Sequence, residues 1–198
     1  MVRPEDDYLE PEFYYSFDEI ERYNKSKNII KTQEKIALRI LDLINSKQNI
    51  NKKKIKLLDL GCGPGHTTLF YKKQGYNIIG LDILDKMLEK AKEKNLNVKK
   101  GDIRELIKLF NLKEFDIIVS ASAIQWIPLK DIKAVARGVY SILKDNGILI
   151  IQFYPKNNKE LYKIFRIFQK NKFLGEIIID NQENPKNKLV FLVLKKSK

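Results

Sequence analysis

The stretch Ile55-Lys56-Leu57-Leu58-Asp59-Leu60-Gly61-Cys62-Gly63-Pro64-Gly65 determines what fold this chain can adopt. An apolar run stops at three glycines within five residues, and an amphipathic segment follows. This order predicts a buried strand, a tight turn and a helix whose first N–H groups point into the gap. A second apolar segment, Tyr76 to Leu81, ends in Asp82, 17 positions past Gly65. A carboxylate at that distance holds a ribose in α/β folds, so the sequence predicts a nucleoside site.

The spacing of the glycines indicates which nucleoside is bound. A dinucleotide fingerprint, G-x-G-x-x-G, would need glycine where His66 stands. Residues Asp59 to Gly65 spell D-x-G-x-G-x-G instead, which resembles the first motif of class I S-adenosylmethionine (SAM) methyltransferases. In that family the acid is linked, often through water, to the ammonium of the methionine moiety. A doubly wound NAD or flavin domain is the alternative at this point.

Composition limits the class of protein. The 198 residues suit one domain, with an N-terminal segment over 1–54 and a Rossmann-like core over 55–198. With no apolar run of transmembrane length and no signal peptide, we expect a cytoplasmic protein without a membrane partner. The single Cys62 excludes an intramolecular disulfide and a cysteine-rich zinc site, and we predict no metal ligands.

The formal charge of +13 is unevenly distributed. Residues 1–21 carry a net charge of −7, and the other 177 residues carry +20. Charge of this size on a globular body attracts polyanions, although a lysine-rich composition that only confers solubility is the other interpretation.

Alternating apolar segments and amphipathic stretches predict the architecture. The expected strands are 55–60, 76–82, 96–100, 115–121, 148–153, 176–179 and 189–194, and the last two form a hairpin around Asn184–Asn187. The expected helices cover 19–23, 36–46, the segment from the glycine turn to Gly75, the segment after Asp85, 131–143 and 157–172. We therefore predict an α/β fold with a seven-stranded, mostly parallel sheet, an antiparallel last strand and helices on both faces.

The N-terminal region carries further expectations. Asp18 and Asp85 are plausible N-cap residues, and Asn24 to Asn28 is a polar break before the next helix. Residues 1–18 are acidic but rich in Tyr and Phe, so we expect them to lie across the core near the cofactor mouth. A frayed terminus is the alternative.

Later segments supply the other candidate site residues. Asp102 follows the short third strand, where SAM enzymes place an acid near the adenine amino group. It could also cap a helix, and both roles can hold at once. After the fourth strand, Ser120 to Pro128 combines small residues that leave room for the methionine tail with Gln125 and Trp126 as polar and stacking groups.

The end of the fifth strand is a candidate base-binding rim. Phe153, Tyr154 and Pro155 lie there, flanked by lysines, as suits a stacked base above a basic groove. We interpret His66 as a loop residue near the cofactor and Cys62 as a small packed residue. With no catalytic residue evident, the best acceptor is a ring nitrogen with a free lone pair, such as guanine N7, because no proton has to leave first.

Four stretches together resemble the small-subunit ribosomal RNA guanine-N7 methyltransferases of eukaryotes and their archaeal relatives. They are Arg3-Pro4-Glu5 with Phe13-Tyr14-Tyr15, Asp59 to Gly65, Ser120 to Ile127, and Gln152 to Asn158. The resemblance extends to Tyr23, Gln33 and the Asn187-Lys188 segment. It implies SAM as donor, guanine N7 of 18S-type rRNA as acceptor, a role in small-subunit assembly, and a small zinc-containing activator protein on the edge strand Leu96–Lys100.

The motifs and the resemblance together nominate two sets of site residues. For the cofactor they are Tyr23, Asp59, Gly61, Gly63, Gly65, Asp82, Ile83, Asp102, Ile103 and Ser120. For the substrate they are Tyr15, Gln125, Trp126, Phe153, Tyr154 and Pro155.

The chain departs from the family pattern in three places. Asn28 stands where the family usually has Arg, the insertion after the tryptophan is shortened to Pro128-Leu129-Lys130, and no long basic tail follows within the 198 residues. We therefore expect an archaeal-type member. A small-molecule SAM methyltransferase and a SAM-binding ribosome assembly factor with dispensable catalysis are the alternatives.

Overall fold

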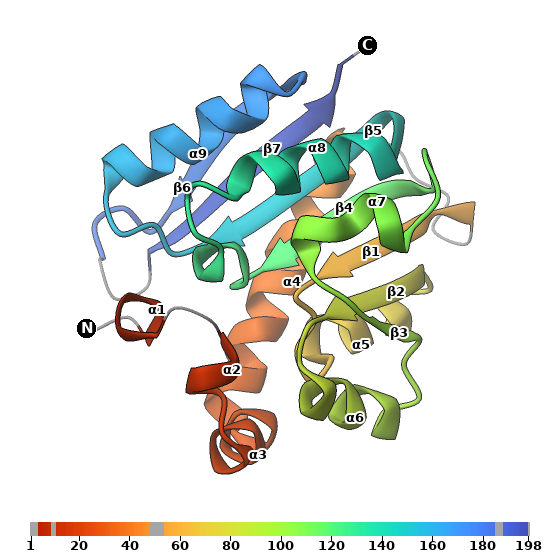
Figure 1. The fold of residues 1–198 in the computed structure, drawn as a ribbon, viewed down its shortest axis with the longest axis vertical. Coiled ribbons are helices and arrows are strands. Elements are labelled where there is room, and N and C mark those ends of the chain that lie inside the picture. Colours follow the sequence, from red (N-terminus) through yellow and green to blue (C-terminus); the bar gives the residue numbers. More distant parts are fainter. Residues whose placement is uncertain (1–3, 9–10, 48–53, 185–187, 198) are drawn as a thin grey trace.

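A computed structural model describes residues 4–8, 11–47, 54–184 and 188–197, and it contains one seven-stranded sheet (Figure 1). The strand order is β3-β2-β1-β4-β5-β7-β6. The strands are β1 Lys56–Leu60, β2 Asn77–Asp82, β3 Val98–Lys100, β4 Phe115–Ala121, β5 Leu143–Phe153, β6 Phe173–Asp180 and β7 Leu189–Lys196. Strands β1 to β5 pair in parallel, and β7 lies antiparallel between β5 and β6, so the predicted sheet is confirmed.

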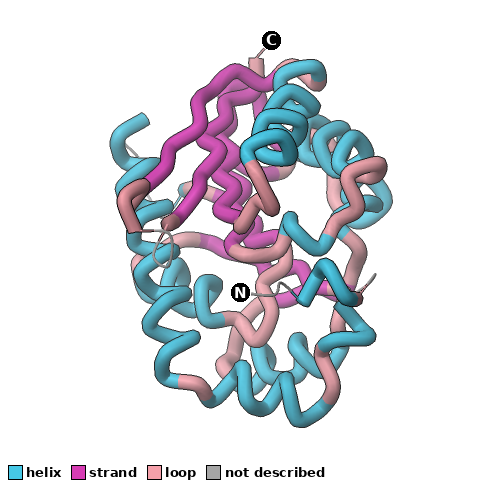
Figure 2. The backbone as a smooth tube through the Cα atoms, turned by 90° about the vertical axis from the view of Figure 1, so that its left-hand side faces the viewer, coloured by secondary structure: helices cyan, strands magenta, loops and turns pink. Residues whose placement is uncertain are grey.

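Helices cover both faces of this sheet, as predicted (Figures 1 and 2). The helices are α1 Pro4–Asp7, α2 Pro11–Tyr14, α3 Phe17–Lys25, α4 Lys27–Lys47, α5 His66–Lys73, α6 Asp85–Glu93, α7 Leu106–Leu109, α8 Ile132–Ile142 and α9 Asn158–Lys170. Short 3₁₀ turns at Ile103–Glu105 and Ile124–Trp126 complete the described elements.

Alternation along the strands divides the core into two layers. Leu57 of β1 packs with α4 and α5 on one face, whereas Leu58 packs with α8 and α9 on the other. Residues 117 and 118 of β4 divide in the same way. Strands that are buried on both faces read as nearly continuous apolar runs, which is why the sequence located them so well.

Helix starts were harder to predict. Ser16, not Asp18, caps α3, because its Oγ accepts the N–H of Glu19 at 3.3 Å. Asp85 does not cap α6 either. It is the first helical residue and is paired with Lys100, and the preceding Leu84 holds the cap position without a side-chain bond. The predicted break over 24–28 reduces to Ser26, which separates α3 from α4.

Several element ends also differ from the prediction. Strand β5 starts at Leu143, so the expected turn at residues 144–147 lies within it and shifts its register against β4. Strand β6 extends over Phe173–Asp180, and β3 shortens to Val98–Lys100. Arg3, most of the basic linker after Asn49 and residues 185–187 of the predicted hairpin turn lie outside the described residues.

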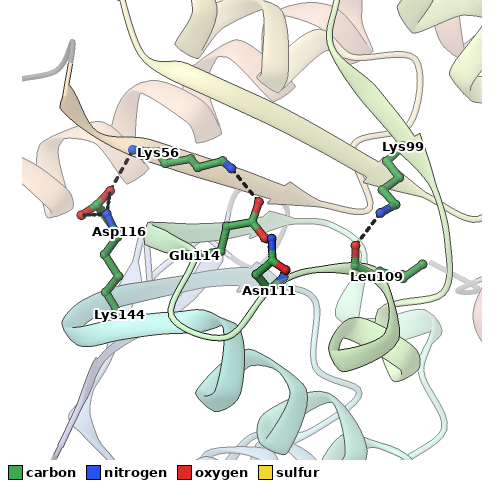
Figure 3. Close-up of polar contacts among 7 residues, drawn as sticks. All are labelled: Lys56, Lys99, Leu109, Asn111, Glu114, Asp116 and Lys144. Carbon is green, nitrogen blue, oxygen red and sulfur yellow. Dashed lines mark hydrogen bonds and ion pairs between the residues drawn. The ribbon is translucent and has the colours of Figure 1, made fainter.

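Polar groups fix the amino ends of the central strands, the end opposite the glycine turn (Figure 3). The carboxylate of Asp116 on β4 accepts the backbone N–H of Lys56 at 2.9 Å and the ammonium of Lys144 at 2.8 Å. Glu114 accepts the ammonium of Lys56 at 2.6 Å and the backbone N–H of Asn111 at 2.7 Å. These bonds tie the start of β1 to the start of β4, so the two strands that flank the crossover share one register.

Candidate functional site

The glycine turn is tied to the end of the neighbouring strand. The N–H groups of Gly61 and Cys62 both donate to the carbonyl of Leu81, at 2.8 and 3.0 Å. The N–H of Gly63 donates to the Asp82 carboxylate at 2.8 Å. Because β1 and β2 are adjacent and parallel, these bonds fix the turn above the carboxyl ends of the strands.

The three glycines of the turn serve different purposes. All have positive φ, which side chains disfavour. A Cβ on Gly61 would lie 2.3 Å from the Cβ of Ala123, and one on Gly65 would lie 2.3 Å from the Cδ1 of Leu96. Gly63 has open space on its exposed side, with only the Met87 sulfur at 4.0 Å. Gly63 therefore opens onto the gap, Gly61 allows close packing against Ala123 at its edge, and Gly65 allows close packing under α6.

A cavity opens beside this turn, at the point where the strand order reverses between β1 and β4. Its empty volume is about 860 Å³, which includes solvent at the open mouth. Its walls come from the turn, the ends of β2 and β4, the start of the 3₁₀ helix and the N-terminal segment. The lining residues are Pro11, Tyr15, Tyr23, Gln33, Gly61, Cys62, Gly63, Pro64, His66, Thr67, Asp82, Ile83, Leu84, Met87, Gly101, Asp102, Ile103, Arg104, Ala121, Ser122, Ala123, Trp126 and Ile127.

Asp82 is the acid that projects into the cavity from the end of β2. One carboxylate oxygen accepts the N–H of Gly63, and the other accepts the N–H of Leu84 at 3.0 Å. Burial raises the pKa of this carboxyl, and the backbone donors oppose that shift. Because a carboxylate oxygen can accept more than one hydrogen bond, Asp82 can also accept from vicinal hydroxyl groups.

Asp102 takes up the helix-cap role that the sequence left open. It accepts the N–H of Arg104 at 2.7 Å, and its other oxygen accepts from the guanidinium of the same residue at 2.7 Å. Both residues line the cavity, next to the apolar side of Ile103. A base in this part of the cavity would meet one acid, one guanidinium and an aliphatic face.

Asp59 lies below the turn, outside the cavity lining. It is 1% exposed, and one oxygen accepts the hydroxyls of Thr67 and Thr68, each at 2.7 Å. Burial raises its pKa to about 6, although the two hydroxyl bonds act in the opposite direction. The carboxyl therefore anchors the start of α5, and burial destabilises its charged form.

The N-terminal segment covers the cavity, as predicted for its described part. The ring of Trp126 lies 5.6 Å from those of Tyr14 and Tyr15, and Tyr15 lies 6.0 Å from Tyr23. Tyr23 in turn stacks on His66 at 6.2 Å. This aromatic row, Tyr14, Tyr15, Tyr23 and Trp126, joins α2, α3 and the loop after β4.

His66 is the first residue of α5 rather than a loop residue, although it does line the cavity. It is 8% exposed, and its Nε2 makes no hydrogen bond to any described residue. Burial, reinforced by Lys94, lowers its pKa to about 4. The imidazole is therefore neutral at pH 7, a state that its position after Gly65 in the sequence did not reveal.

Most nominated residues gather at the cavity, but several do not. Tyr15, Tyr23, Trp126 and the residues of the turn and the β2 end line it, whereas Asp59, Gly65, Ser120, Gln125, Phe153, Tyr154 and Pro155 do not. Phe153 is fully buried in the core with α8 and α9, so the prediction that it stacks on a base is wrong. Ser120 is also fully buried and donates to the carbonyl of Leu60, so a direct cofactor contact is excluded for it.

Gln152 and Gln125 support the rim next to Ser122. The Oε1 of Gln152 accepts the N–H and the hydroxyl of Ser122 at 3.1 and 2.9 Å. The Nε2 of Gln125 donates to the Ser122 carbonyl at 3.1 Å, and its buried Oε1 has no partner among the described residues. Several wall residues, including Pro11, Leu84 and Ile127, carry no polar signal from which sequence reasoning could have found them.

Comparison with known proteins identifies the family. Residues 57–147 match the model of a methyltransferase domain. The chain is 30% identical to an 18S rRNA (guanine-N(7))-methyltransferase of Bos taurus, over 93% of this chain and 68% of that protein. It is 31% identical to the 18S rRNA (guanine(1575)-N(7))-methyltransferase of Saccharomyces cerevisiae, over 93% and 69%. The chain belongs to the 18S rRNA guanine-N7 methyltransferase family.

Solved structures agree on the fold. Magnesium protoporphyrin IX methyltransferase from Synechocystis, solved with bound SAM, aligns with a TM-score of 0.75 over 99% of both chains at 16% identity. The class I methyltransferase fold and the family resemblance read from the sequence are thus confirmed, and the NAD or flavin alternative is wrong. Among the described residues, no helix is long and apolar enough to cross a membrane.

Gly61→Ala tests how tightly the turn is packed. The variant should lose at least about 2 kcal/mol more unfolding free energy than Gly75→Ala, because its new methyl group meets Ala123. Gly75 is the control, since it has a positive φ of 90° but nothing within 4 Å of an added Cβ. Urea unfolding measures both. Equal losses would mean that backbone conformation alone, and not the contact with Ala123, requires glycine at position 61.

Asp59→Asn tests the buried carboxyl through pH. The folded-state pKa of Asp59 is raised to about 6, so the folded protein holds a proton on this carboxyl more tightly than the unfolded chain does. This protonation stabilises the fold fully below about pH 4, and the stabilisation is lost as the pH rises through about 6. Relative to the wild type, Asp59→Asn should therefore gain on the order of 2–3 kcal/mol between pH 4 and 7. Urea unfolding of both proteins across that range measures the difference. A difference that does not change with pH would contradict the raised pKa.

Proposed function

We propose that this protein transfers the methyl group of SAM to N7 of a guanine in small-subunit ribosomal RNA. The observation that carries the proposal is the cavity at the strand crossover, where the glycine turn and the Asp82 carboxylate meet. Membership of the guanine-N7 methyltransferase family supports the acceptor, since relatives that share about 30% of their residues over most of this chain carry that activity in their names.

Several residues that line the cavity support SAM as its ligand. The open acceptor positions of Asp82 suit the two ribose hydroxyls, and the narrow turn at Gly61 and Gly63 leaves room for the methionine end. Asp102 and Ile103 suit the adenine, with a polar edge and an apolar face. Tyr23, which stacks on His66 at the start of α5, supplies an aromatic wall. SAM supplies a methyl group on a positively charged sulfur, and the chain must hold the acceptor in line with it.

Methylation of guanine N7 requires little acid–base catalysis from this site. Its lone pair forms the new N–CH₃ bond while the S–CH₃ bond breaks towards sulfur, and the positive charge passes to the guanine ring. No proton has to be removed, so positioning carries the rate. Tyr15 and Trp126, which both line the cavity, provide flat walls against which a base can align.

The charge distribution favours RNA over the small-molecule alternative. The chain carries a formal charge of +13, which suits a polyanion and has no use in binding a small neutral acceptor. The assembly factor whose catalysis is dispensable stays the alternative prediction. The cytoplasmic location stays a prediction.

We also propose the edge of β3 as the docking site of a small zinc-containing activator protein. β3 is an edge strand whose one neighbour is β2, and its Lys99 and Lys100 are exposed. A free edge of this kind supports strand addition by a partner. Co-purification with mass spectrometry identifies the partner. A partner that leaves the backbone amides of β3 open to hydrogen exchange would argue against this edge.

Asp82→Asn tests the nucleoside site. Loss of the charged acceptor should weaken SAM binding by about 10–100-fold, because hydrogen bonds to charged groups contribute roughly 1.5–3 kcal/mol. Asp85→Asn, three residues along and exposed, is the matched control and should bind SAM as the wild type does. Isothermal calorimetry measures both. A wild-type protein that gives no heat with SAM, even with its partner added, would contradict the proposal.

Ribosomal RNA from a strain that lacks this protein tests the acceptor. N7-methylguanine allows chain cleavage after reduction, so reverse transcription of treated rRNA should lose one stop in the deletion strain. The wild-type gene should restore that stop, and Asp82→Asn should not. An unchanged set of stops would refute the rRNA acceptor. If Asp82→Asn restores ribosome assembly but not the stop, binding rather than catalysis is essential for assembly.

A further inference from the structure

The outer face of α9 carries a continuous basic stripe. Its members are exposed and are spaced so that they lie on one side of the helix. They are Lys159, Tyr162, Lys163, Arg166 and Lys170. The stripe is about 16 Å long at 1.5 Å per residue, which is enough to follow several nucleotides.

None of the four cations in this stripe forms an ion pair with another described residue. Elsewhere many basic side chains do. Lys56 pairs with Glu114, and Lys90 pairs with Glu21. The one acid of α9, Glu160, turns back to accept the N–H of Lys156. The charge of the stripe is therefore not neutralised within the described fold.

The stripe starts beside the cavity. β5 ends at Phe153 and α9 starts at Asn158, so few residues separate the helix from the rim. At that rim, Gln152 holds Ser122, which lines the cavity. From there α9 runs back along the sheet, where it packs on α8 and β6 (Figure 1). An RNA strand that leaves the cavity at this side would meet the start of α9 first.

The opposite face of α9 argues against insertion into a membrane. Leu161, Ile164 and Phe168 are buried in the core with β5 and β7, so no apolar face is available for insertion. On the stripe itself, the ring of Tyr162 is 53% exposed between cations. An exposed aromatic ring among basic groups suits a stacked base next to a phosphate backbone.

We infer that the stripe on α9 binds the phosphates of the RNA strand that flanks the acceptor guanine. The inference rests on the proposed rRNA substrate and adds the path of the RNA strand across the protein surface. Lys159, Lys163, Arg166 and Lys170 contact phosphates, and Tyr162 stacks on a base. Because phosphate contacts carry no sequence information, the stripe sets affinity and register while the cavity selects the guanine.

The double variant Lys159→Glu/Lys163→Glu tests this inference. Its matched control is Lys73→Glu/Lys92→Glu, which makes the same change in charge at exposed lysines near the far ends of α5 and α6. Fluorescence anisotropy with a labelled single-stranded RNA of mixed sequence measures the affinity of each full-length protein across a series of salt concentrations. Circular dichroism and calorimetry with SAM check that each variant is folded and that its cavity is intact.

The stripe variant should bind RNA at least about tenfold more weakly than the wild type, and its log–log salt slope should fall by about 1.4, or about 0.7 per lost contact. The control should keep both values, and Lys159→Arg/Lys163→Arg should also keep them. Equal weakening of the stripe variant and the control would overturn the inference, because net charge alone would then explain binding.

Two further readouts separate this inference from the proposed function. Tyr162→Ala should weaken RNA binding and leave the salt slope unchanged, because stacking releases no counterions. If the stripe variant binds RNA like the wild type while SAM binding and rRNA methylation persist, the inference fails and the function stands. If the wild type binds RNA through the stripe but methylates no guanine, the function fails instead.

Discussion

The hydrogen bond from the Gly63 N–H to the Asp82 carboxylate is the constraint on which the site depends. It joins the turn after β1 to the end of β2, and the Leu84 N–H occupies the other carboxylate oxygen. Together with the bonds from the Gly61 and Cys62 N–H groups to the Leu81 carbonyl, it fixes the turn above the sheet, where the turn forms one wall of the cavity. Burial raises the pKa of the same carboxyl, which means that its charged form is destabilised. The fold nevertheless places this carboxylate where the hydroxyl group of a ligand can donate to it.

The two ends of the sheet differ in whether their polar groups have partners within the described protein. At the amino ends, Asp116 and Glu114 have their partners within the protein, and the strands are locked together (Figure 3). At the carboxyl ends, the Nε2 of His66 and the Oε1 of Gln125 are buried without a partner among the described residues. Buried polar atoms are normally satisfied, so the open Nε2 of His66, which lines the cavity, is available to a ligand there.

The sequence was most informative where one local pattern determines the structure. Strand β4 has the bounds that its apolar run predicted, and Asp82 and the glycine turn were recognised from spacing alone. The sequence was least informative where a side chain has two plausible partners. Asp85 looked like a cap but pairs with Lys100, and Asp102 looked like either a cap or a ligand group and caps the 3₁₀ helix. Spacing shows which residues are near each other along the chain, but it does not rank their partners in space.

Phe153 shows a second limit. An aromatic residue at the end of β5 is compatible with either face of the sheet, and the alternation of the strand directs Phe153 to the core and Gln152 to the rim. The aromatic row could not be predicted for a different reason. Its residues are far apart in the sequence, and only the packing of α2 and α3 brings Tyr15 and Tyr23 to Trp126 and His66.

Charge pairing differs between two sides of the cavity. On one side of the cavity, Glu21 holds Lys90, and Lys94 donates to the Pro64 carbonyl of the turn and to Asn24 of α3, both at 2.7 Å. These contacts of Lys90 and Lys94 hold the acidic N-terminal segment in place over the cavity. On the side where α9 begins, the stripe has no such counterpart. Unpaired cations such as Lys31 and Lys73 also lie elsewhere on the described surface, but those of the stripe follow one another along α9. Their alignment on one helix face that leads away from the cavity is what a polyanionic substrate requires.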